Sequence, residues 1–194
     1  MSLNLIMGAR NNAVTERESN DFYATHPQAV HLLLEQLKKD NVVLNKNIWE
    51  CACGQGHMAE VFKKYGYDVI ATDLVNRGYG DELNFLTQNL DFAFKLDIFT
   101  NPPFKYALEF AYKGIQTLPY PGCKLGLFLK IQFLESKERK ELFEHYPPKY
   151  VYIYSMRQHC AKNADFERFK AKTQAYIWVI WEKNYQGETI LRWI

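Results

Sequence analysis

Several features are scarce in this sequence of 194 residues, and each scarcity excludes a class of protein. Only four residues are cysteine, too few and too irregularly spaced for a disulfide scaffold, so we expect reduced thiols. No apolar run approaches the roughly eighteen residues of a membrane-spanning helix. Residues 1–12 lack a charged and then apolar leader, so we expect no secretory signal. The formal net charge of +2 is far from that of a histone-like protein or a polybasic membrane binder.

The composition that remains is typical of one soluble cytoplasmic domain. Apolar residues make up 47% and charged residues 24%, which favours a sizeable core over disorder. Aromatic residues reach 15%, and they serve either as stacking surfaces or, more plainly, as core. Residues 1–20 are polar and without periodicity. We therefore expect a flexible tail over residues 1–20 and a single domain over residues 21–194.

Apolar strand-like segments alternate with amphipathic helical ones along most of the chain. The predicted strands are 47–54, 67–74, 96–100, 124–131, 150–155 and 174–183, and the predicted helices lie within 21–39, 57–65, 106–118 and 136–146. Thr25 with Gln28 predicts a capping box for the first helix, with Pro27 in its first turn. The alternation predicts an α/β fold with a doubly wound, mostly parallel sheet and helices on both faces. The last two strands are too close for an obvious crossover helix, so we expect an antiparallel ending.

The end of the first predicted strand of the sheet is a candidate ligand site. Gly54 and Gly56 in the segment Glu50–Gly56 allow a tight turn that a ligand can approach closely. Asp73 ends the second strand, where a carboxylate can accept hydrogen bonds from ribose hydroxyls. Together they predict a nucleoside-type cofactor without specifying which one. The plainer alternative is turn chemistry followed by a helix cap.

Cys51 and Cys53, with His57 nearby, raise the question of a metal site. A Cys-x-Cys pair on a strand points both thiols to one buried face, and no second pair matches it. We therefore interpret both as core thiols and predict no metal.

Asn101-Pro102-Pro103-Phe104, directly after an apolar strand, is the sharpest feature of the sequence. Two prolines fix the backbone and remove two N–H donors, leaving the Asn101 side-chain oxygen and the Pro102 carbonyl as acceptors beside an aromatic plane. Such a group suits a planar ring that carries an exocyclic amine. Hydrogen bonds that draw this nitrogen toward tetrahedral geometry favour its attack on an electrophilic methyl group. The alternative is a rigid turn with Asn101 as a helix cap.

These residues carry a family resemblance. The chain resembles the S-adenosylmethionine-dependent DNA N6-adenine methyltransferases, in particular the small phage-type enzymes. The segments that match are residues 21–27, the glycine turn Glu50–Gly56, Asp73, the motif Asn101–Phe104, residues 128–143 and residues 185–194. The resemblance implies a seven-stranded Rossmann-like methyltransferase sheet with an antiparallel last strand, and a cytoplasmic protein encoded by a bacterium or phage.

The resemblance also assigns roles to residues of this chain. It implies that Asn101, Pro102, Pro103 and Phe104 are catalytic: Asn101 and Pro102 orient the amine, and Phe104 stacks on the target base. The residues that it implies for S-adenosylmethionine are Tyr23, Thr25, Glu50, Cys51, Gly54, Gly56, Asp73, Asn84 and Phe85. Where many members have Asp-Phe, this chain has Asn84-Phe85, and an amide oxygen can still accept from the adenine amine of the cofactor.

DNA is the expected partner, and a polar segment near the end of the chain is the candidate contact. Residues 157–173 carry several cations that could meet phosphates: Arg157, Lys162, Arg168, Lys170 and Lys172. A solvated loop is an equally good interpretation. The short spacing between Gly56 and Asn101 leaves no room for a separate target-recognition domain. Recognition would then come from loops, a short target site or a protein partner.

Four other functions remain open on the sequence. The same motif serves RNA adenine N6 methyltransferases and the glutamine N5 methyltransferases that modify release factors. A non-catalytic module that binds the cofactor would share the fold. A dehydrogenase would explain the glycines and Asp73 but would leave Asn101–Phe104 without a role.

Overall fold

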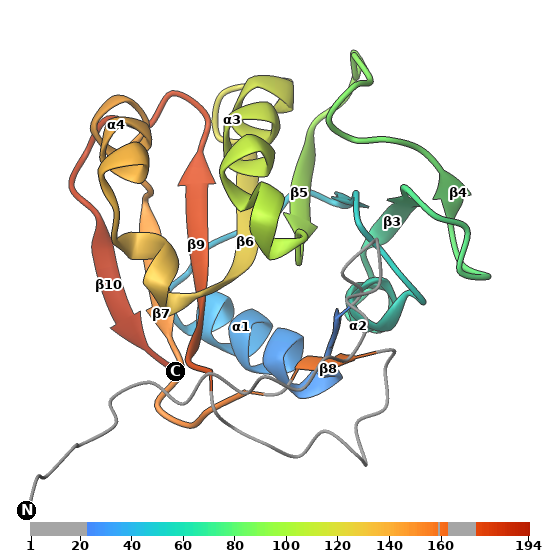
Figure 1. Cartoon of the computed structure of the whole chain (residues 1–194), viewed down its shortest axis with the longest axis horizontal. Coiled ribbons are helices and arrows are strands. Elements are labelled where there is room, and N and C mark those ends of the chain that lie inside the picture. Colours follow the sequence, from blue (N-terminus) through green and yellow to red (C-terminus); the bar gives the residue numbers. More distant parts are fainter. Residues whose placement is uncertain (1–22, 159, 163–173) are drawn as a thin grey trace, which may run out of the picture.

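The computed structural model describes residues 23–158, 160–162 and 174–194. The expected flexible tail, residues 1–20, lies outside them. In the described part, an eight-stranded sheet has the order β10-β7-β9-β6-β5-β2-β3-β4, and a separate two-stranded ribbon pairs β1 with β8. Figure 1 shows the sheet extending from β10 at one edge to β4 at the other. The predicted α/β fold, doubly wound around a mostly parallel sheet, is confirmed.

The elements follow the predicted alternation. The helices are α1 (Pro27–Lys39), α2 (His57–Lys64), α3 (Ala107–Thr117) and α4 (Lys137–His145), with short 3-10 turns at Phe104–Tyr106 and Ile131–Leu134. The strands are β1 (Tyr23–Thr25), β2 (Asn47–Glu50), β3 (Asp68–Asp73), β4 (Asp81–Glu82), β5 (Leu96–Thr100), β6 (Lys124–Lys130), β7 (Tyr150–Ile153), β8 (Cys160–Lys162), β9 (Tyr176–Glu182) and β10 (Ile190–Trp193).

Two apolar layers enclose the sheet. Helices α1 and α2 pack on one face, where Leu33 and Phe62 meet Trp178 in one buried cluster. Helices α3 and α4 cover the other face, where Ala111 and Leu142 belong to a second cluster. Helices on both faces hide the central strands from water, which explains why β5 is buried at every position.

The strand count differs from the seven that we expected. The last strand of the chain is β10, which pairs in parallel with β7 at the sheet edge. The antiparallel pairing expected of the last two predicted strands is confirmed, because β9 pairs antiparallel with β7, and also with β6, although β10 follows β9 in the chain. Residues 190–193 were missed because the strand has only four residues, and its apolar residues Ile190, Leu191 and Trp193 do not alternate with polar ones. The short β4 lies between the predicted strands 67–74 and 96–100, where no element was predicted.

The start of α1 also differs from the prediction. His26 is the N-cap, and its Nδ1 accepts a hydrogen bond from the Gln28 N–H at 3.2 Å. Thr25 does not cap the helix, because it is held in β1 opposite Cys160 of β8. The pairing of β1 with β8 joins segments far apart in the sequence, and it brings residues 23–25 to the carboxyl-end side of the sheet.

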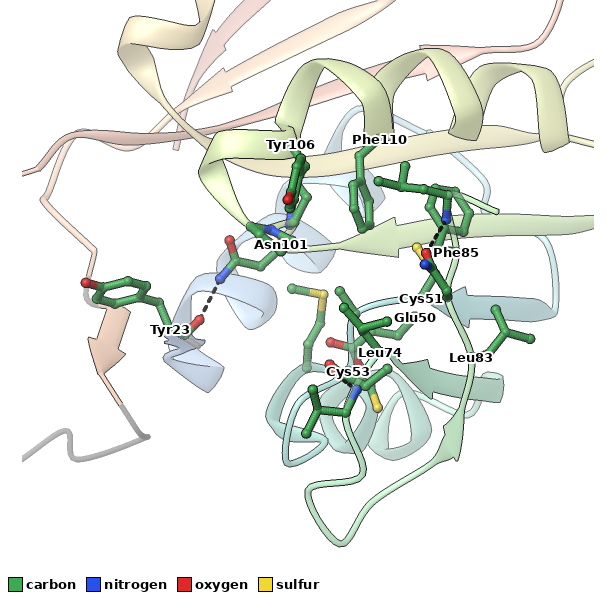
Figure 2. A pocket seen from close by; sticks show the side chains of 18 of the residues that line it. Tyr23, Glu50, Cys51, Cys53, Leu74, Leu83, Phe85, Asn101, Tyr106 and Phe110 are labelled. Atoms are coloured by element: carbon green, nitrogen blue, oxygen red, sulfur yellow. Dashed lines mark hydrogen bonds between the residues drawn. The ribbon is translucent and has the colours of Figure 1, made fainter. Parts of the chain in front are cut away.

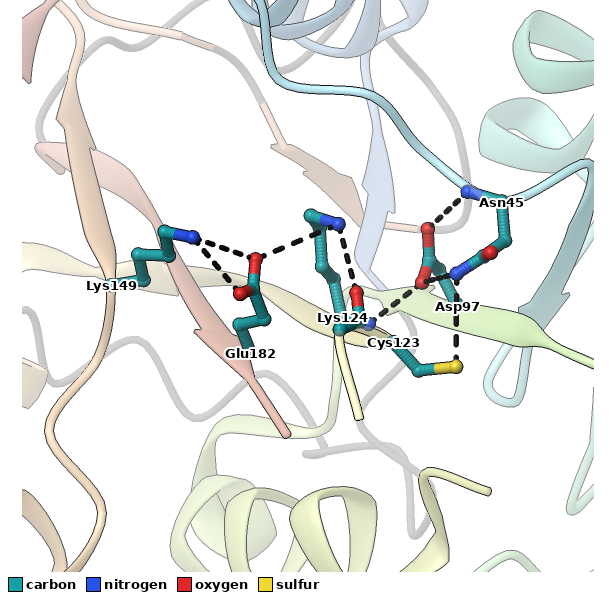
Figure 3. A network of polar contacts seen from close by, with 7 residues as sticks. Asn45, Asp97, Cys123, Lys124, Lys149 and Glu182 are labelled. Carbon is teal, nitrogen blue, oxygen red and sulfur yellow. Dashed lines mark hydrogen bonds and ion pairs between the residues drawn. The ribbon is translucent and has the colours of Figure 1, made fainter. Parts of the chain in front are cut away.

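A polar network holds the opposite, amino-terminal edge of the parallel strands (Figure 3). Asp97 of β5 is fully buried and accepts from the Asn45 N–H, the Asn45 side-chain amide and the Lys124 N–H, each at 2.7 Å. Glu182 pairs with Lys149 at 2.9 Å and with Lys124 at 3.7 Å. Because these groups lie at the far edge from the carboxyl ends, we assign them to stability.

Candidate functional site

The carboxyl ends of β2, β3 and β5 open onto a pocket of about 360 Å³. The chain turns from β2 to β3 on one side and reaches β5 on the other, so the order of strands reverses here. Ligands of open α/β sheets bind at such a point. Figure 2 shows side chains from the strand ends and from the start of α3 converging on this pocket.

Most of the predicted site residues line the pocket together. They are Tyr23, Thr25, Glu50, Cys51, Asp73, Asn84, Phe85, Asn101, Pro102, Pro103 and Phe104. Gly54 and Gly56 are not among the lining residues, but they shape the turn that carries the pocket wall. The sequence thus identified the residues that meet at this point, while their roles stay predictions.

The glycine turn is locked to the end of β3. The Gly54 N–H donates to Asp73 Oδ2 at 2.8 Å, and the Val75 N–H donates to Asp73 Oδ1 at 2.9 Å. Each carboxylate oxygen has a second lone pair, so Asp73 can still accept from a ligand hydroxyl. Gly56 has φ +80° and begins α2, a conformation that an L side chain rarely adopts.

The loop after β3 folds back over this turn through Tyr79. A Cβ on Gly56 would lie 2.5 Å from the Tyr79 ring, so only glycine leaves room for it. The Tyr79 hydroxyl donates to Glu60 at 2.6 Å and accepts from Lys63 at 2.7 Å, which ties the ring to α2. The loop also brings Leu74, Val75 and Arg77 to the pocket.

Glu50 is a buried carboxylate at the bottom of the pocket. Its residue is 3% exposed, and its Oε2 has no hydrogen-bond partner. Burial raises its pKa well above the usual range, a backbone hydrogen bond near Ala59 opposes this, and the negative Asp73 adds to the rise. A carboxylate in this situation is stabilised by a positively charged ligand.

The Asn101 side chain is fixed by a contact that the sequence did not predict. Its Nδ2 donates to the Tyr23 carbonyl oxygen of β1 at 2.8 Å, as Figure 2 shows. This bond assigns the other atom, Oδ1, as a buried acceptor that has no partner. The Asn101 Oδ1 is therefore a hydrogen-bond acceptor that is fixed in orientation and has no partner, and it belongs to a residue that lines the pocket.

Phe104 is half-buried beside Asn101, and its plane is set by other aromatic rings. Its ring centroid lies 6.2 Å from that of Tyr23 and 6.1 Å from that of Tyr176. The Tyr176 ring stacks in turn on Phe128 at 4.9 Å. These ring contacts therefore hold the Phe104 side chain in place where it lines the pocket.

Asn84 and Phe85 both line the pocket, and each is also held by local contacts. Asn84 Oδ1 accepts from the Leu86 N–H at 3.1 Å, which leaves one lone pair for a ligand. Phe85 is 3% exposed and packs edge-on against Trp49 at 5.3 Å. Phe85 therefore supports the core as well as the pocket.

The cysteines near the glycine turn are buried. Burial raises the pKa of Cys51, and it raises the pKa of Cys53 to about 12, so both thiols are protonated near neutral pH. Among the residues that the structure describes, no group of three or more His, Cys, Asp and Glu side chains could hold a metal ion. Nor does that part of the chain contain a helix long and apolar enough to cross a bilayer.

The candidate nucleic-acid contacts are mostly untested. Arg168, Lys170 and Lys172 lie outside the described residues. Arg157 is described and does not line the pocket, whereas only the backbone of Lys162 is described, and it pairs with Tyr23 of β1.

Several lining residues escaped the sequence analysis. Leu74 is 53% exposed and offers an apolar surface beside Asp73. Tyr106 is 40% exposed and lies near Asn101, as Figure 2 shows. The sequence could have indicated these two residues only by their position, because each lies one or two residues after a predicted site residue.

Known structures share this fold at low sequence identity. A proposed class I S-adenosylmethionine-dependent methyltransferase of Listeria monocytogenes matches with a TM-score of 0.60 and 13% identity over 88% of this chain. A type I restriction-modification methyltransferase subunit of Streptococcus thermophilus matches with a TM-score of 0.64 and 13% identity, also over 88%. A proposed RNA methyltransferase of Pyrococcus horikoshii matches with a TM-score of 0.57 and 13% identity over 83%.

This chain spans 65% of the Listeria protein, 47% of the Streptococcus subunit and 86% of the Pyrococcus protein. No protein-family profile matches the sequence, and no curated protein sequence matches it. The likeness establishes that the fold is that of class I methyltransferases.

Proposed function

We propose that this chain transfers a methyl group from S-adenosylmethionine to the exocyclic N6 amine of a flipped-out adenine in DNA. The observation that carries the proposal concerns Asn101, which lines the pocket. Its Oδ1 is buried and has no hydrogen-bond partner, while its Nδ2 donates to the Tyr23 carbonyl oxygen. A fixed acceptor costs little reorganisation when positive charge develops on an amine. A turn with a purely structural role would not need this oxygen to stay unsatisfied.

The residues of the pocket fit the cofactor. S-adenosylmethionine supplies an electrophilic methyl group on a positively charged sulfonium. Glu50 would face its positive methionine end, because Glu50 Oε2 is buried without a partner. Asp73 would accept from the ribose hydroxyls. Tyr23, Thr25, Cys51, Asn84 and Phe85 line the same space, and Gly54 and Gly56 shape the turn beside it.

The charge of the pocket disfavours a nicotinamide dinucleotide. The pyrophosphate of such a ligand carries negative charge, and the ionised form of the buried Glu50, whose Oε2 has no partner, would repel it. A dehydrogenase would also leave the Asn101 acceptor idle. Both points favour a cationic cofactor and an amine substrate.

The catalytic motif would act on the amine by position. Asn101 Oδ1 and the Pro102 carbonyl would accept the two N–H hydrogens, and Phe104 would stack on the purine. These bonds draw the nitrogen lone pair out of conjugation and toward the methyl group. An adenine in a duplex must first leave the stack, at a cost of a few kcal/mol.

Support for DNA as the substrate comes from solved structures that share the fold, three of which belong to type I restriction-modification systems. The methyltransferase subunit of a type I restriction-modification system is among them, and so is a proposed RNA methyltransferase. A solved structure on the assembly of a type I restriction-modification system also shares the fold, which supports a protein partner for this chain. Target recognition would then come from loops or from that partner.

A methyl-transfer assay tests the proposal. Purified protein is incubated with tritium-labelled S-adenosylmethionine and, separately, with duplex DNA, RNA or a glutamine-containing protein substrate. We expect label in duplex DNA, in N6-methyladenine. Label only in RNA or only in protein would show that RNA or protein, and not DNA, is the substrate. Cofactor binding with no transfer to any of the three would favour a non-catalytic module.

A further inference from the structure

Lys130 lies beside the proposed base-stacking ring. It is the last residue of β6, at the carboxyl end of the strand, and it is half-buried. Its Nζ lies 4.3 Å from the centroid of the Phe104 ring. Across the ladder it is paired with Tyr176 of β9, whose own ring contacts Phe104. Lys130 therefore packs against the same cluster of aromatic rings as Phe104 of the proposed catalytic motif.

The bonding of Lys130 differs from that of the other shielded lysines. Each of the other lysines whose side chain is described and is not exposed directs its ammonium to an oxygen atom. Lys113 donates to Asn89, Lys183 donates to the Leu118 carbonyl, and Lys124 and Lys149 both pair with Glu182. Among the described residues, Lys130 has a ring and no oxygen.

A ring face is a weak substitute for an oxygen acceptor. The attraction between an ammonium and an aromatic face is modest, whereas a charge-assisted hydrogen bond to an anion is short and strong. Because the Lys130 ammonium contacts a ring face and no protein oxygen within the described residues, it is ready to bind an anion. Lysine also has a flexible four-carbon stem, so its ammonium can leave the ring without moving the strand.

The position of Lys130 indicates which part of a substrate it meets. It does not line the pocket, whereas Phe104 does. A base that enters the pocket and stacks on Phe104 would leave its sugar and phosphates outside, on the side where Lys130 can reach them. A glutamine side chain in the same place would bring no negative charge.

We infer that Lys130 contacts a phosphate of the target nucleotide, and that this contact makes nucleic acid rather than a protein side chain the substrate of the pocket. The inference rests on the proposed function and narrows it. It assigns to Lys130 a role in substrate binding and leaves cofactor binding to other residues.

The salt dependence of methylation tests the contact. Each phosphate neutralised by a protein cation lowers the slope of log affinity against log salt by about 0.9 for duplex DNA. We expect Lys130→Gln to lower kcat/KM for duplex DNA about tenfold or more and to make its salt slope shallower by about 0.9. Lys130→Arg should retain the wild-type slope. The Kd for S-adenosylmethionine should not change, which also reports that each variant is folded.

The control is Lys38→Gln, which removes an exposed lysine in the last turn of α1. It should keep the wild-type rate and slope. A Lys130→Gln variant with the wild-type slope would overturn the inference, even if its rate fell. Wild-type protein that methylates no DNA would instead overturn the proposed function.

A second measurement avoids substitution of the protein. Once the methylated adenine has been mapped, one phosphate beside it is replaced by an uncharged methylphosphonate. We expect the wild-type rate to fall about tenfold or more for one of the two flanking positions, and the Lys130→Gln rate to be insensitive to both. Equal sensitivity of the two proteins would contradict the contact.

Discussion

Replacement of Asn101 by alanine removes the group on which the proposed chemistry depends. The change deletes Oδ1, the buried acceptor, and also Nδ2, which holds the Tyr23 carbonyl at 2.8 Å. The methyl-bearing cofactor would lie against Glu50 and Asp73, which the substitution does not touch. We therefore expect binding of S-adenosylmethionine to change by less than about threefold, since the lost bond to Tyr23 is a single partly exposed hydrogen bond.

The expected loss of rate follows from the role of the acceptor. Deletion of one preorganised hydrogen-bonding group that acts on developing charge costs about 10²–10³ in kcat, or roughly 3–4 kcal/mol. Asn101→Asp is the matched variant, because it keeps an acceptor but turns an oxygen toward the Tyr23 carbonyl. The orientation of the substituted side chain is then less well fixed than that of Asn101. We expect the methylation rate of this variant to lie between those of the wild type and Asn101→Ala.

Single-turnover methylation of duplex DNA, with the cofactor in excess, measures this step directly. Calorimetry gives the cofactor Kd of the same protein samples. An Asn101→Ala protein with a wild-type single-turnover rate would refute the catalytic assignment. A protein that no longer binds the cofactor would show that Asn101 supports the pocket instead.

Three further predictions concern the pocket and the fold. Glu50→Gln should weaken cofactor binding about tenfold or more by calorimetry, because the amide carries no charge. Since burial raises the pKa of Glu50 and a cationic ligand binds the ionised form, wild-type affinity should rise with pH through that pKa, and the variant should lose this rise. Gly56→Ala places a Cβ 2.5 Å from the Tyr79 ring at φ +80°, so we expect lower stability by about 1–3 kcal/mol and weaker cofactor binding. Asp97→Asn leaves at least one of three N–H donors unpaired, which should lower the free energy of unfolding in urea by about 2–4 kcal/mol without altering the methylation rate of the folded protein.

The predictable part of the site comes from residues that end parallel strands. Glu50, Asp73 and Asn101 follow apolar segments with clear local patterns, and the carboxyl ends of parallel strands meet at one edge. Once the strands were identified, their convergence followed. The glycine turn and the two prolines added conformational restrictions that are also local.

What the sequence did not predict depends on contacts between distant segments. The pairing of Tyr23–Thr25 with Cys160–Lys162 has no local pattern, yet it places the carbonyl that orients Asn101. It also explains why His26 rather than Thr25 caps α1. The approach of Lys130 to Phe104 also depends on tertiary structure, because the pairing of β5 with β6 brings together two residues that are distant in the sequence.

Adenine methylation in DNA is the central claim, and it is tested most directly in a host that lacks its own DNA methylation. The chain and its Asn101→Ala variant are expressed there, and the genomic DNA is analysed for modified nucleosides and sequenced for modified positions. The account predicts N6-methyladenine at a defined short sequence with the wild-type chain and almost none with the variant. Unmodified adenine in the presence of folded wild-type protein that binds S-adenosylmethionine would contradict it.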